Sequence, residues 1–181
     1  MALGTDYVHQ DCSLARALEV AGERWSMLII RDAFYGVRRF NDFLVHLDIP
    51  RAVLTSRLQS LVAAGVLSRE PYQQSPVRYD YSLTEAGREL WLPIFTLARW
   101  GERHSKPGGQ LTRYSHTDCG EQLDHTGTCP RCGRIVPPEE VTMERLAGTL
   151  VKPRQDPVAR ALTGPRRLMT PIDTESASTH A

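Results

Sequence analysis

Residues 50–64 read PRAVLTSRLQSLVAA, and their pattern predicts an amphipathic helix. We expect this helix to begin at or just after Pro50, because proline fits the first turn of a helix and disfavours a helical conformation in the residue before it. One face of the helix gathers apolar side chains at helical spacing, namely Leu54, Leu58, Leu61 and Val62. The segment therefore has one face to bury and one face to present.

The neighbouring segments complete a recognisable order of elements. Residues 39–47 also carry apolar side chains at helical spacing, which predicts a helix just before the first one. After Gly65 come two β-rich pieces, residues 66–70 and 77–83, joined by the polar loop PYQQSP. Two helices across a tight turn, followed by a hairpin, are typical of a winged helix-turn-helix, whose second helix enters the DNA major groove. We expect a mainly α fold with a small β-hairpin wing.

The polar face of the helix at 50–64 suits contact with DNA. Serine and glutamine side chains can reach base edges, whereas arginine can hold phosphate or guanine. Together with the arginines before the helix and the polar residues of the wing, the candidate DNA contacts are Arg38, Arg39, Arg51, Thr55, Ser56, Arg57, Gln59, Gln73, Gln74 and Arg78. The alternative is an ordinary surface helix with a solvated polar face beside a plain hairpin. The helix-turn-helix context favours DNA.

Further helices are predicted on both sides of this module. Residues 11–21 and 24–34 precede it, and the second of these is apolar nearly all round, which predicts the buried centre of the domain. Residues 84–104 follow as a long helix that Pro93 should kink. The apolar surface of residues 84–104 is broad for a small domain, so we expect a homodimer, which would also supply the two-fold symmetry of paired half-sites. Packing within one chain is the alternative.

Composition excludes several classes of protein. The chain has 181 residues, of which 41% are hydrophobic and 24% charged, as in soluble globular proteins. No run approaches the about 18 apolar residues of a membrane span, and the N-terminus lacks the pattern of a signal peptide, so we expect a cytoplasmic protein. The net charge of +1 requires any attraction for phosphate to be local. No nucleotide-binding or hydrolase motif is present, which indicates that the protein is not an enzyme.

A cluster of cysteines predicts a metal site in the C-terminal half. The pairs are His116-x2-Cys119 and Cys129-x2-Cys132, and the C-P-x-C-G turn at 129–133 has the geometry of a zinc knuckle. A glycine after Cys119 and after Cys132 permits the tight turns, although the first pair is His-x2-Cys and not Cys-x2-Cys. One histidine and three cysteines form a closed tetrahedral set, which predicts one structural zinc per chain. His125 is an alternative fourth ligand. A reversible Cys129–Cys132 disulfide is the competing chemistry, although the surrounding sequence lacks the βαβ pattern of thioredoxin-like proteins.

The remaining cysteine, Cys12, stands at the start of the first predicted helix. The helix dipole stabilises a thiolate at such a position, which suits a sensor of oxidants or electrophiles. A small residue buried at a dimer interface is the alternative, because free cysteine is among the most buried residue types.

Short pieces between about positions 11 and 105 form one ordered series: Cys12 with ARAL (15–18), GERW (22–25), LIIRD (28–32), RRFNDF (38–43), LTSRL (54–58), YDYSLTEAG (79–87) and WG (100–101). In these pieces the chain resembles the HxlR-type transcriptional regulators, which are relatives of the MarR winged-helix proteins. The resemblance implies a homodimer that binds DNA through residues 50–64 and the wing at 72–78 and controls nearby genes. Some members sense oxidants, quinones or aldehydes at the position of Cys12, where a proline usually follows and Ser13 stands here.

These patterns predict three regions and one function. Residues 1–106 form the DNA-binding and dimerisation domain, residues 107–147 a zinc-ribbon-like unit, and residues 148–181 a flexible tail. A short helix around 141–150 is expected where the unit meets the tail. The function is a sequence-specific regulator that binds double-stranded DNA as a homodimer and responds to a redox or small-molecule signal. The alternative is a winged-helix module that binds protein, with the zinc ribbon as its docking surface. Steep salt dependence of binding to duplex DNA would distinguish the two.

Overall fold

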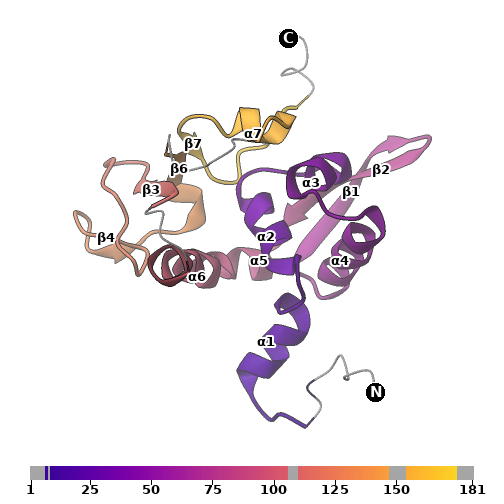
Figure 1. The fold of residues 1–181 in the computed structure, drawn as a ribbon, viewed down its shortest axis with the longest axis horizontal. Helices are drawn as coiled ribbons and strands as arrows, with labels where there is room; N and C mark the ends of the chain where they lie inside the picture. Colours follow the sequence, from indigo (N-terminus) through magenta and orange to yellow (C-terminus); the bar gives the residue numbers. More distant parts are fainter. Residues whose placement is uncertain (1–6, 8, 106–109, 147–153, 175–181) are drawn as a thin grey trace.

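The computed structural model describes residue 7 and residues 9–105, 110–146 and 154–174. Its first half follows the predicted order: α1 (Ser13–Ala21), α2 (Ser26–Phe34), α3 (Phe40–Leu47), α4 (Arg51–Ala63), β1 (Leu67–Gln74), β2 (Val77–Leu83), α5 (Glu85–Glu89) and α6 (Trp91–His104) (Figure 1). The second half contains β3 (Thr112–His116), β4 (Thr128–Cys129), β5 (Arg134–Ile135), the 3-10 helix η1 (Pro138–Glu140), β6 (Val141–Arg145), α7 (Pro157–Ala161) and β7 (Arg166–Arg167). The expected fold class is confirmed.

Helix α2 forms the centre of the helix-turn-helix domain, as its apolar sequence predicts. Ile29, Ile30 and Phe34 of this helix are fully buried. Around them pack Phe43 of α3 and the predicted inner face of α4, of which Leu54, Leu58 and Leu61 are buried and Val62 is half-buried. The helical spacing therefore selects the buried face correctly, because side chains three and four residues apart lie on the same side of a helix.

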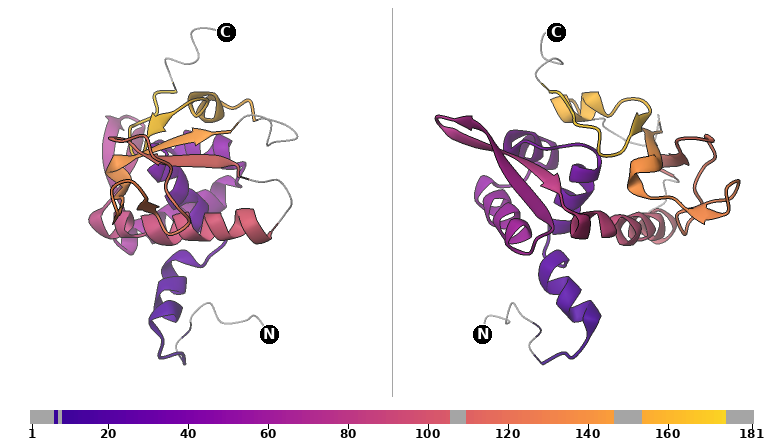
Figure 2. Two further views of the ribbon diagram at one scale, coloured as in Figure 1. Left: turned by 90° about the vertical axis from the view of Figure 1, so that its left-hand side faces the viewer. Right: turned by 180° about the vertical axis from the view of Figure 1, so that it is seen from behind.

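The wing is an antiparallel hairpin whose strands are longer than the sequence predicts. Its register runs from Leu67 opposite Leu83 to Gln74 opposite Val77, and Ser75 and Pro76 form the turn. Pro71 does not end β1, because the missing N–H of a proline can face solvent in a two-stranded sheet. The register shifts between Pro71 and Gln73. The wing and the unit that contains β3 lie at opposite ends of the molecule (Figure 2).

The predicted long helix is broken at Leu90, so the expected kink at Pro93 is wrong in position. Helix α5 ends at Glu89 and α6 begins at Trp91, which places Pro93 in the first turn of α6. In a continuous helix the ring of Pro93 would meet the carbonyl group of Glu89, whereas in a first turn its missing N–H is not needed. Thr84 caps α5 by accepting a hydrogen bond from the N–H of Gly87 at 3.1 Å.

We call residues 110–146 together with β7 the C-terminal unit. It contains two small antiparallel sheets, one of order β3-β6-β7 and one of β4 and β5. The helix expected around 141–150 is wrong, because Val141–Arg145 is strand β6 and pairs along its whole length with β3. Residues 147–150 lie outside the described residues. Val141 and Met143 are buried while the residues between and after them are partly exposed, which is the period-2 pattern of a strand.

Residues 154–174 belong to the predicted flexible tail but are folded against the domain. Four of their apolar side chains are buried, namely Val158, Ala159, Leu162 and Leu168. The N–H of Met169 donates to the carbonyl of Phe34 at 2.6 Å, and the N–H of Ile172 donates to that of Gly36 at 2.9 Å. Gly36 has φ +93°, and a Cβ there would lie 1.9 Å from the carbonyl oxygen of Thr170, so only glycine allows this close approach. The three region boundaries themselves stay predictions.

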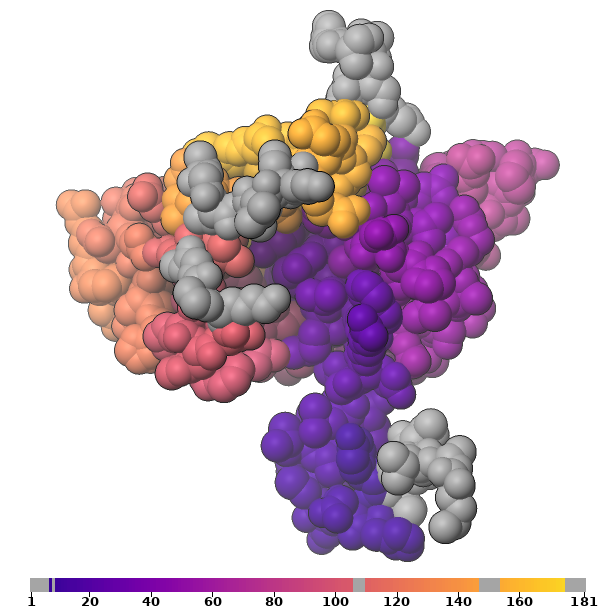
Figure 3. Space-filling view, viewed as in Figure 1, coloured from indigo at the N-terminus to yellow at the C-terminus, as the bar shows by residue number. Residues whose placement is uncertain are grey.

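Helix α1 stands away from the body of the molecule (Figure 3). Of its residues only Ala15 and Ala21 are buried, while Leu14 and Leu18 are exposed. Among the described residues, no helix combines the length and the apolar character needed to cross a membrane.

Candidate nucleic-acid interface and metal centre

The outward face of α4 carries the polar side chains that the sequence singles out. Thr55, Ser56 and Gln59 are exposed, opposite the buried leucines of the same helix. The hydroxyl of Thr55 donates to the carbonyl oxygen of Arg51 at 2.9 Å, so part of its hydrogen-bonding capacity is used within the helix. Ser56 and Gln59 present hydrogen-bonding groups outward, as a base-reading helix requires.

A groove of about 590 Å³ lies between the starts of α3 and α4 and the wing, and we call it the wing groove. Three candidate DNA contacts line it: Arg39, Arg51 and Arg78. The guanidinium of Arg39 stacks over the ring of Tyr72 at 4.9 Å, and that of Arg51 over the ring of Phe40 at 5.2 Å. Such stacking holds a long, positively charged side chain in place.

The wing groove is predominantly cationic. Asp42 is the one acidic residue in its wall among the described residues, and it accepts a hydrogen bond from Thr174 at 3.0 Å. Asp80, next to the groove, lies 3.9 Å from the guanidinium of Arg39. The chain's net charge of +1 is therefore distributed unevenly, and this surface supplies local positive charge of the kind that attraction for phosphate requires.

Other candidate contacts lie elsewhere. Arg57 forms an ion pair of 2.9 Å with Glu23, just before α2. Arg38 is half-buried and lines a separate small cavity. The amide of Gln73 donates to the carbonyl of Ser75 at 3.0 Å within the turn of the wing, and Gln74 is exposed. The Arg57–Glu23 pair joins separate helical regions, so no pattern within either segment could have revealed it.

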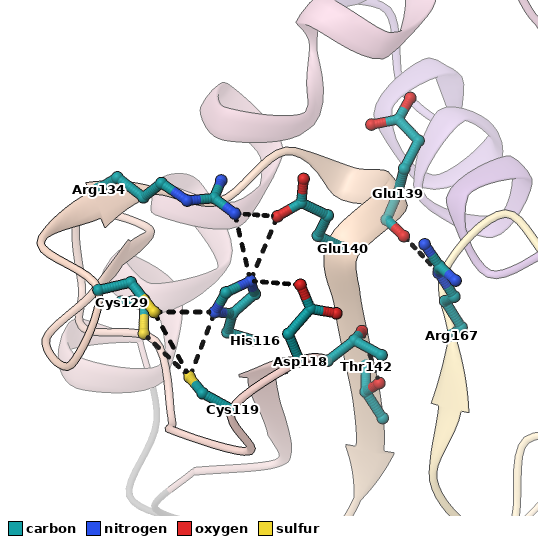
Figure 4. A network of polar contacts seen from close by, with 11 residues as sticks. His116, Asp118, Cys119, Cys129, Arg134, Glu139, Glu140, Thr142 and Arg167 are labelled. Atoms are coloured by element: carbon teal, nitrogen blue, oxygen red, sulfur yellow. Dashed lines mark hydrogen bonds and ion pairs between the residues drawn. The ribbon is translucent and has the colours of Figure 1, made fainter.

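The predicted metal ligands meet in one cluster (Figure 4), in the unit that lies at the end of the molecule opposite the wing (Figure 1). Nδ1 of His116 lies 3.2 Å from Sγ of Cys119 and 3.4 Å from Sγ of Cys132. Sγ of Cys119 lies 3.5 Å from that of Cys129 and 3.8 Å from that of Cys132. A tetrahedral site with Zn–S of about 2.3 Å and Zn–N of about 2.0 Å has edges of about 3.5–3.8 Å, so the donor set fits.

His116, and not His125, accompanies the three cysteines. The four ligand atoms lie within 4.8 Å of one another, and His125 is not in this group. Two turns bring them together: the N–H of Gly120 donates to the carbonyl of His116, and that of Gly133 donates to the carbonyl of Cys129, each at 2.8 Å. Of the two alternatives left open by the sequence, this geometry favours His116.

Two further residues beside His116, Arg134 and Glu140, are not predicted from the sequence. Nε2 of His116 lies 3.2 Å from a carboxylate oxygen of Glu140, which also accepts a hydrogen bond from Arg134. This bond from Arg134 holds the pKa of Glu140 below its ordinary value. A carboxylate at one ring nitrogen directs the other toward a metal and raises its basicity. Glu140 lies far from His116 in the chain, and no ligand spacing marks it.

The sulfur atoms are too close together to lose all their protons without a cation. Burial raises the pKa of the Cys129 thiol, but the N–H of Cys132 and the side chains of Cys119 and His116 lower it, and the value falls to about 7. Contacts with Cys129 and Cys119 raise the pKa of Cys132 to about 11. Repulsion between neighbouring thiolates is the cost that a bound metal ion removes, because it binds the deprotonated form. The cluster could therefore hold a metal ion.

Cys12 stands apart from this cluster. It is the exposed N-cap residue of α1, and its carbonyl accepts a hydrogen bond from the N–H of Arg16 at 3.2 Å. Its exposure suits a reactive thiol and also a position that a second copy of the chain would cover.

Comparison with known proteins places this geometry in context. The 45% identity to the uncharacterised HTH-type transcriptional regulator Rv3095 of Mycobacterium tuberculosis extends over 133 residues, which are 73% of this chain and 84% of that protein. The uncharacterised HTH-type regulator YdeP of Bacillus subtilis is 36% identical over 106 residues, covering 56% and 83%. The crystal structure of PA1607, a candidate transcription factor, superposes with a TM-score of 0.58 at 31% identity, covering 81% of this chain and 96% of that one.

These relatives define the class of the protein as a transcriptional regulator of the helix-turn-helix type. Residues 20–109 match the model of the HxlR-like helix-turn-helix. The chain belongs to this HxlR-like family, which confirms the resemblance seen in its sequence. Regulators of this class are generally not enzymes, in agreement with the absence of catalytic motifs from the sequence.

Proposed function

We propose that the protein binds specific sequences of double-stranded DNA as a homodimer, with α4 in the major groove and the wing against the backbone. The observation that carries this proposal is the position of the wing groove. Its three arginines, Arg39, Arg51 and Arg78, lie between the wing and the start of α4, whose exposed face holds Ser56 and Gln59. Phosphate contacts fix a protein's position on the duplex and base contacts supply specificity, and this surface offers both kinds of group.

Fluorescence-anisotropy titration against the upstream intergenic DNA of its own gene and against a scrambled duplex, at two salt concentrations, tests this proposal. Arg78→Ala should weaken binding to both duplexes and reduce the salt slope by about 1. Gln59→Ala should instead change the preference between them by about 1–3 kcal/mol. Arg113→Ala, at the far end of the molecule, is the matched control. Weak binding to both duplexes without salt dependence would favour the alternative of a protein-binding module.

The same proposal assigns roles to the remaining polar residues. Thr55, Ser56 and Gln59 read bases, whereas the arginines and the wing residues Gln73 and Gln74 contact the backbone. Arg38 and Arg57 belong to the backbone-contacting set. For Arg57 this contact requires the guanidinium to leave Glu23, so Glu23→Gln should tighten DNA binding if Arg57 touches phosphate. Unchanged affinity in Glu23→Gln would remove Arg57 from the interface.

The homodimer is supported by apolar side chains that a single chain leaves uncovered. Leu14 of the protruding α1 is 64% exposed, and Leu97 and Trp100 of α6 are each 54% exposed. Burial of apolar surface against a second copy would stabilise a dimer and hold two α4 helices at a fixed separation. Sedimentation velocity of Trp100→Glu should show a monomer. Ile135→Glu, equally exposed in the C-terminal unit, should leave the dimer intact.

We further propose that the metal is one structural zinc ion per chain, held by His116, Cys119, Cys129 and Cys132. Three thiolates and one imidazole nitrogen are a donor set that favours zinc, and four protein ligands leave no open position. The ion would hold the two turns of the C-terminal unit together. Elemental analysis of protein purified under reducing conditions should give one zinc per chain, and Cys132→Ser should lower this value.

Cys12 is the proposed site of a response to oxidants. Hydrogen peroxide would convert its thiolate to a sulfenic acid with release of hydroxide, next to the exposed apolar side chains of α1. DNA affinity should change after peroxide treatment in the native protein. The same change in Cys12→Ser would assign the response to another group.

A further inference from the structure

A second cavity, of about 400 Å³, lies where the helix-turn-helix domain meets the C-terminal unit, and we call it the junction cavity. Its wall is formed by five segments: α2 with the turn before it, the end of α3, the start of β3, the end of β6, and the segment before α7. These segments are far apart in sequence. The volume is within the about 300–1,000 Å³ range of small-molecule sites.

The wall of the junction cavity carries three guanidinium groups and, among the described residues, no carboxylate. Arg31 is bound by the fully buried carboxylate of Asp32, at 2.6 and 2.9 Å. Arg154 donates to Asp156 at 2.9 Å. The third guanidinium belongs to Arg145, for which the part of the chain described by the structure offers no carboxylate partner. The Asp156 carboxylate also lies 2.9 Å from Nδ1 of His46, so Arg145 is the guanidinium of this wall that is left to pair with an anionic ligand.

Most of the remaining wall is apolar or aromatic, and His46 and Thr112 add two polar side chains; its apolar and aromatic members are Trp25, Leu28, Tyr35, Leu47, Leu111 and Leu146. Leu28 and Leu111 are 39% and 40% exposed. Trp25 has φ +85°, a left-handed conformation that is uncommon for a bulky residue and costs free energy. Such conformations cluster at ligand sites, where they hold a side chain in a required position. Here the strained residue supplies an indole ring to the cavity wall.

We propose that the junction cavity binds a small monocarboxylate with an aromatic body. The carboxylate would pair with Arg145 and the ring would pack on Trp25 and the leucines, because apolar walls with a few converging polar groups are the usual form of such sites. The ligand would touch α3 through His46 and Leu47 and the C-terminal unit through Arg145 and Thr112. It would therefore connect the first helix of the helix-turn-helix to the C-terminal unit.

Titration calorimetry of the full chain with 2-naphthoate, and with neutral 2-naphthamide of the same shape, tests the site. One equivalent of 2-naphthoate should bind per chain. Arg145→Gln should weaken this binding by roughly tenfold or more, as for loss of a charge-assisted hydrogen bond, and the amide should bind as weakly. Arg113→Gln is the matched control, because Arg113 lies on the neighbouring strand β3, pairs with Glu144 and does not line the cavity.

Two results would overturn the proposal. One is the absence of saturable binding below about 1 mM. The other is equal affinity of Arg145→Gln and Arg113→Gln for 2-naphthoate. Leu28→Glu provides a second variant that changes an exposed residue of α2, and its added negative charge should abolish binding without requiring any change in the C-terminal unit.

A regulatory effect of this ligand rests on the DNA-binding function proposed above, whereas its binding does not. Saturating 2-naphthoate should change the affinity for the preferred duplex in the native chain and not in Arg145→Gln. Unchanged DNA affinity in a chain that binds 2-naphthoate by calorimetry would refute the regulatory effect alone. A chain that binds 2-naphthoate but no DNA would refute the proposed function and leave the binding site standing.

Discussion

Replacement of Glu140 by glutamine tests how the proposed metal centre is organised. The Glu140 carboxylate faces Nε2 of His116 at 3.2 Å and also holds Arg134. In the native chain it fixes the ring so that Nδ1 points at Cys119 and Cys132. Glutamine keeps an oxygen that can accept the hydrogen bond from His116, but it removes the charge that makes the imidazole a stronger ligand. Zinc affinity should therefore fall.

The structure limits the size of this effect. Loss of a residue that orients a metal ligand typically lowers affinity by about 10–100-fold, which is about 1.4–2.7 kcal/mol. The side chain of Glu140 is 31% exposed, so solvent screens part of its charge. Because the acceptor oxygen is also retained, we expect a decrease near tenfold. Arg134→Gln should have a smaller effect, since it leaves the Glu140 carboxylate in place.

Competition with a chromophoric zinc chelator would measure the affinity, and circular dichroism of the zinc-loaded proteins would show whether the fold is kept. Glu139→Gln is the control, because it removes the same charge from the adjacent residue. The side chain of Glu139 lies 3.7 Å from Arg88 and points away from His116 (Figure 4). Equal zinc affinity of the Glu140→Gln and Glu139→Gln proteins would refute the orienting role of Glu140.

Three predictions concern how the C-terminal segments are attached. Tyr35→Phe and Tyr114→Phe each leave a buried hydroxyl without its 2.7 Å partner and should cost about 1–3 kcal/mol in chemical denaturation, whereas the double variant should cost less than their sum. Burial raises the pKa of Asp156, but hydrogen bonds from Arg154, the N–H of Ala159 and His46 lower it below the ordinary value of 3.8. The stabilisation by the charged carboxylate should therefore be complete at about pH 6 and be lost as the pH falls through the folded-state pKa. The difference in Tm between the native chain and Asp156→Asn should shrink over the same fall in pH. Gly36→Ala should destabilise the chain more than Gly65→Ala and expose residues 169–172 to protease, because both glycines have positive φ but only Gly36 faces a backbone carbonyl; equal Tm values for the two variants would contradict this.

The sequence was sufficient for features that depend on residues close together in the chain. The inner face of α4 followed from the spacing of Leu54, Leu58 and Leu61, and the same reasoning identified α2 as the centre of the domain. The two turns that carry the candidate metal ligands followed from the x2 spacing. In each case the geometry of a few consecutive residues determines which side chains share a face or bind one ion.

Local patterns gave a wrong prediction in two places. Pro93 was expected to kink a helix in place, but the helix broke three residues earlier at Leu90, because the first turn of α6 accommodates proline without loss of a hydrogen bond. Strand β6 was expected to be a helix, and pairing with β3 decided otherwise. Pairing partners lie outside any window of sequence.

By itself the sequence determined the helix-turn-helix, its wing and the three clustered cysteines of a candidate metal site, because periodicity and ligand spacing are properties of neighbouring residues. Only the tertiary structure decided that His116 joins the cysteines, that Glu140 orients it, and that Arg57 pairs with Glu23. It alone seated residues 154–174 against α2 and enclosed the junction cavity. These features consist of contacts between side chains and strands distant in the chain, and the free energy of such contacts depends on the packing of the whole molecule.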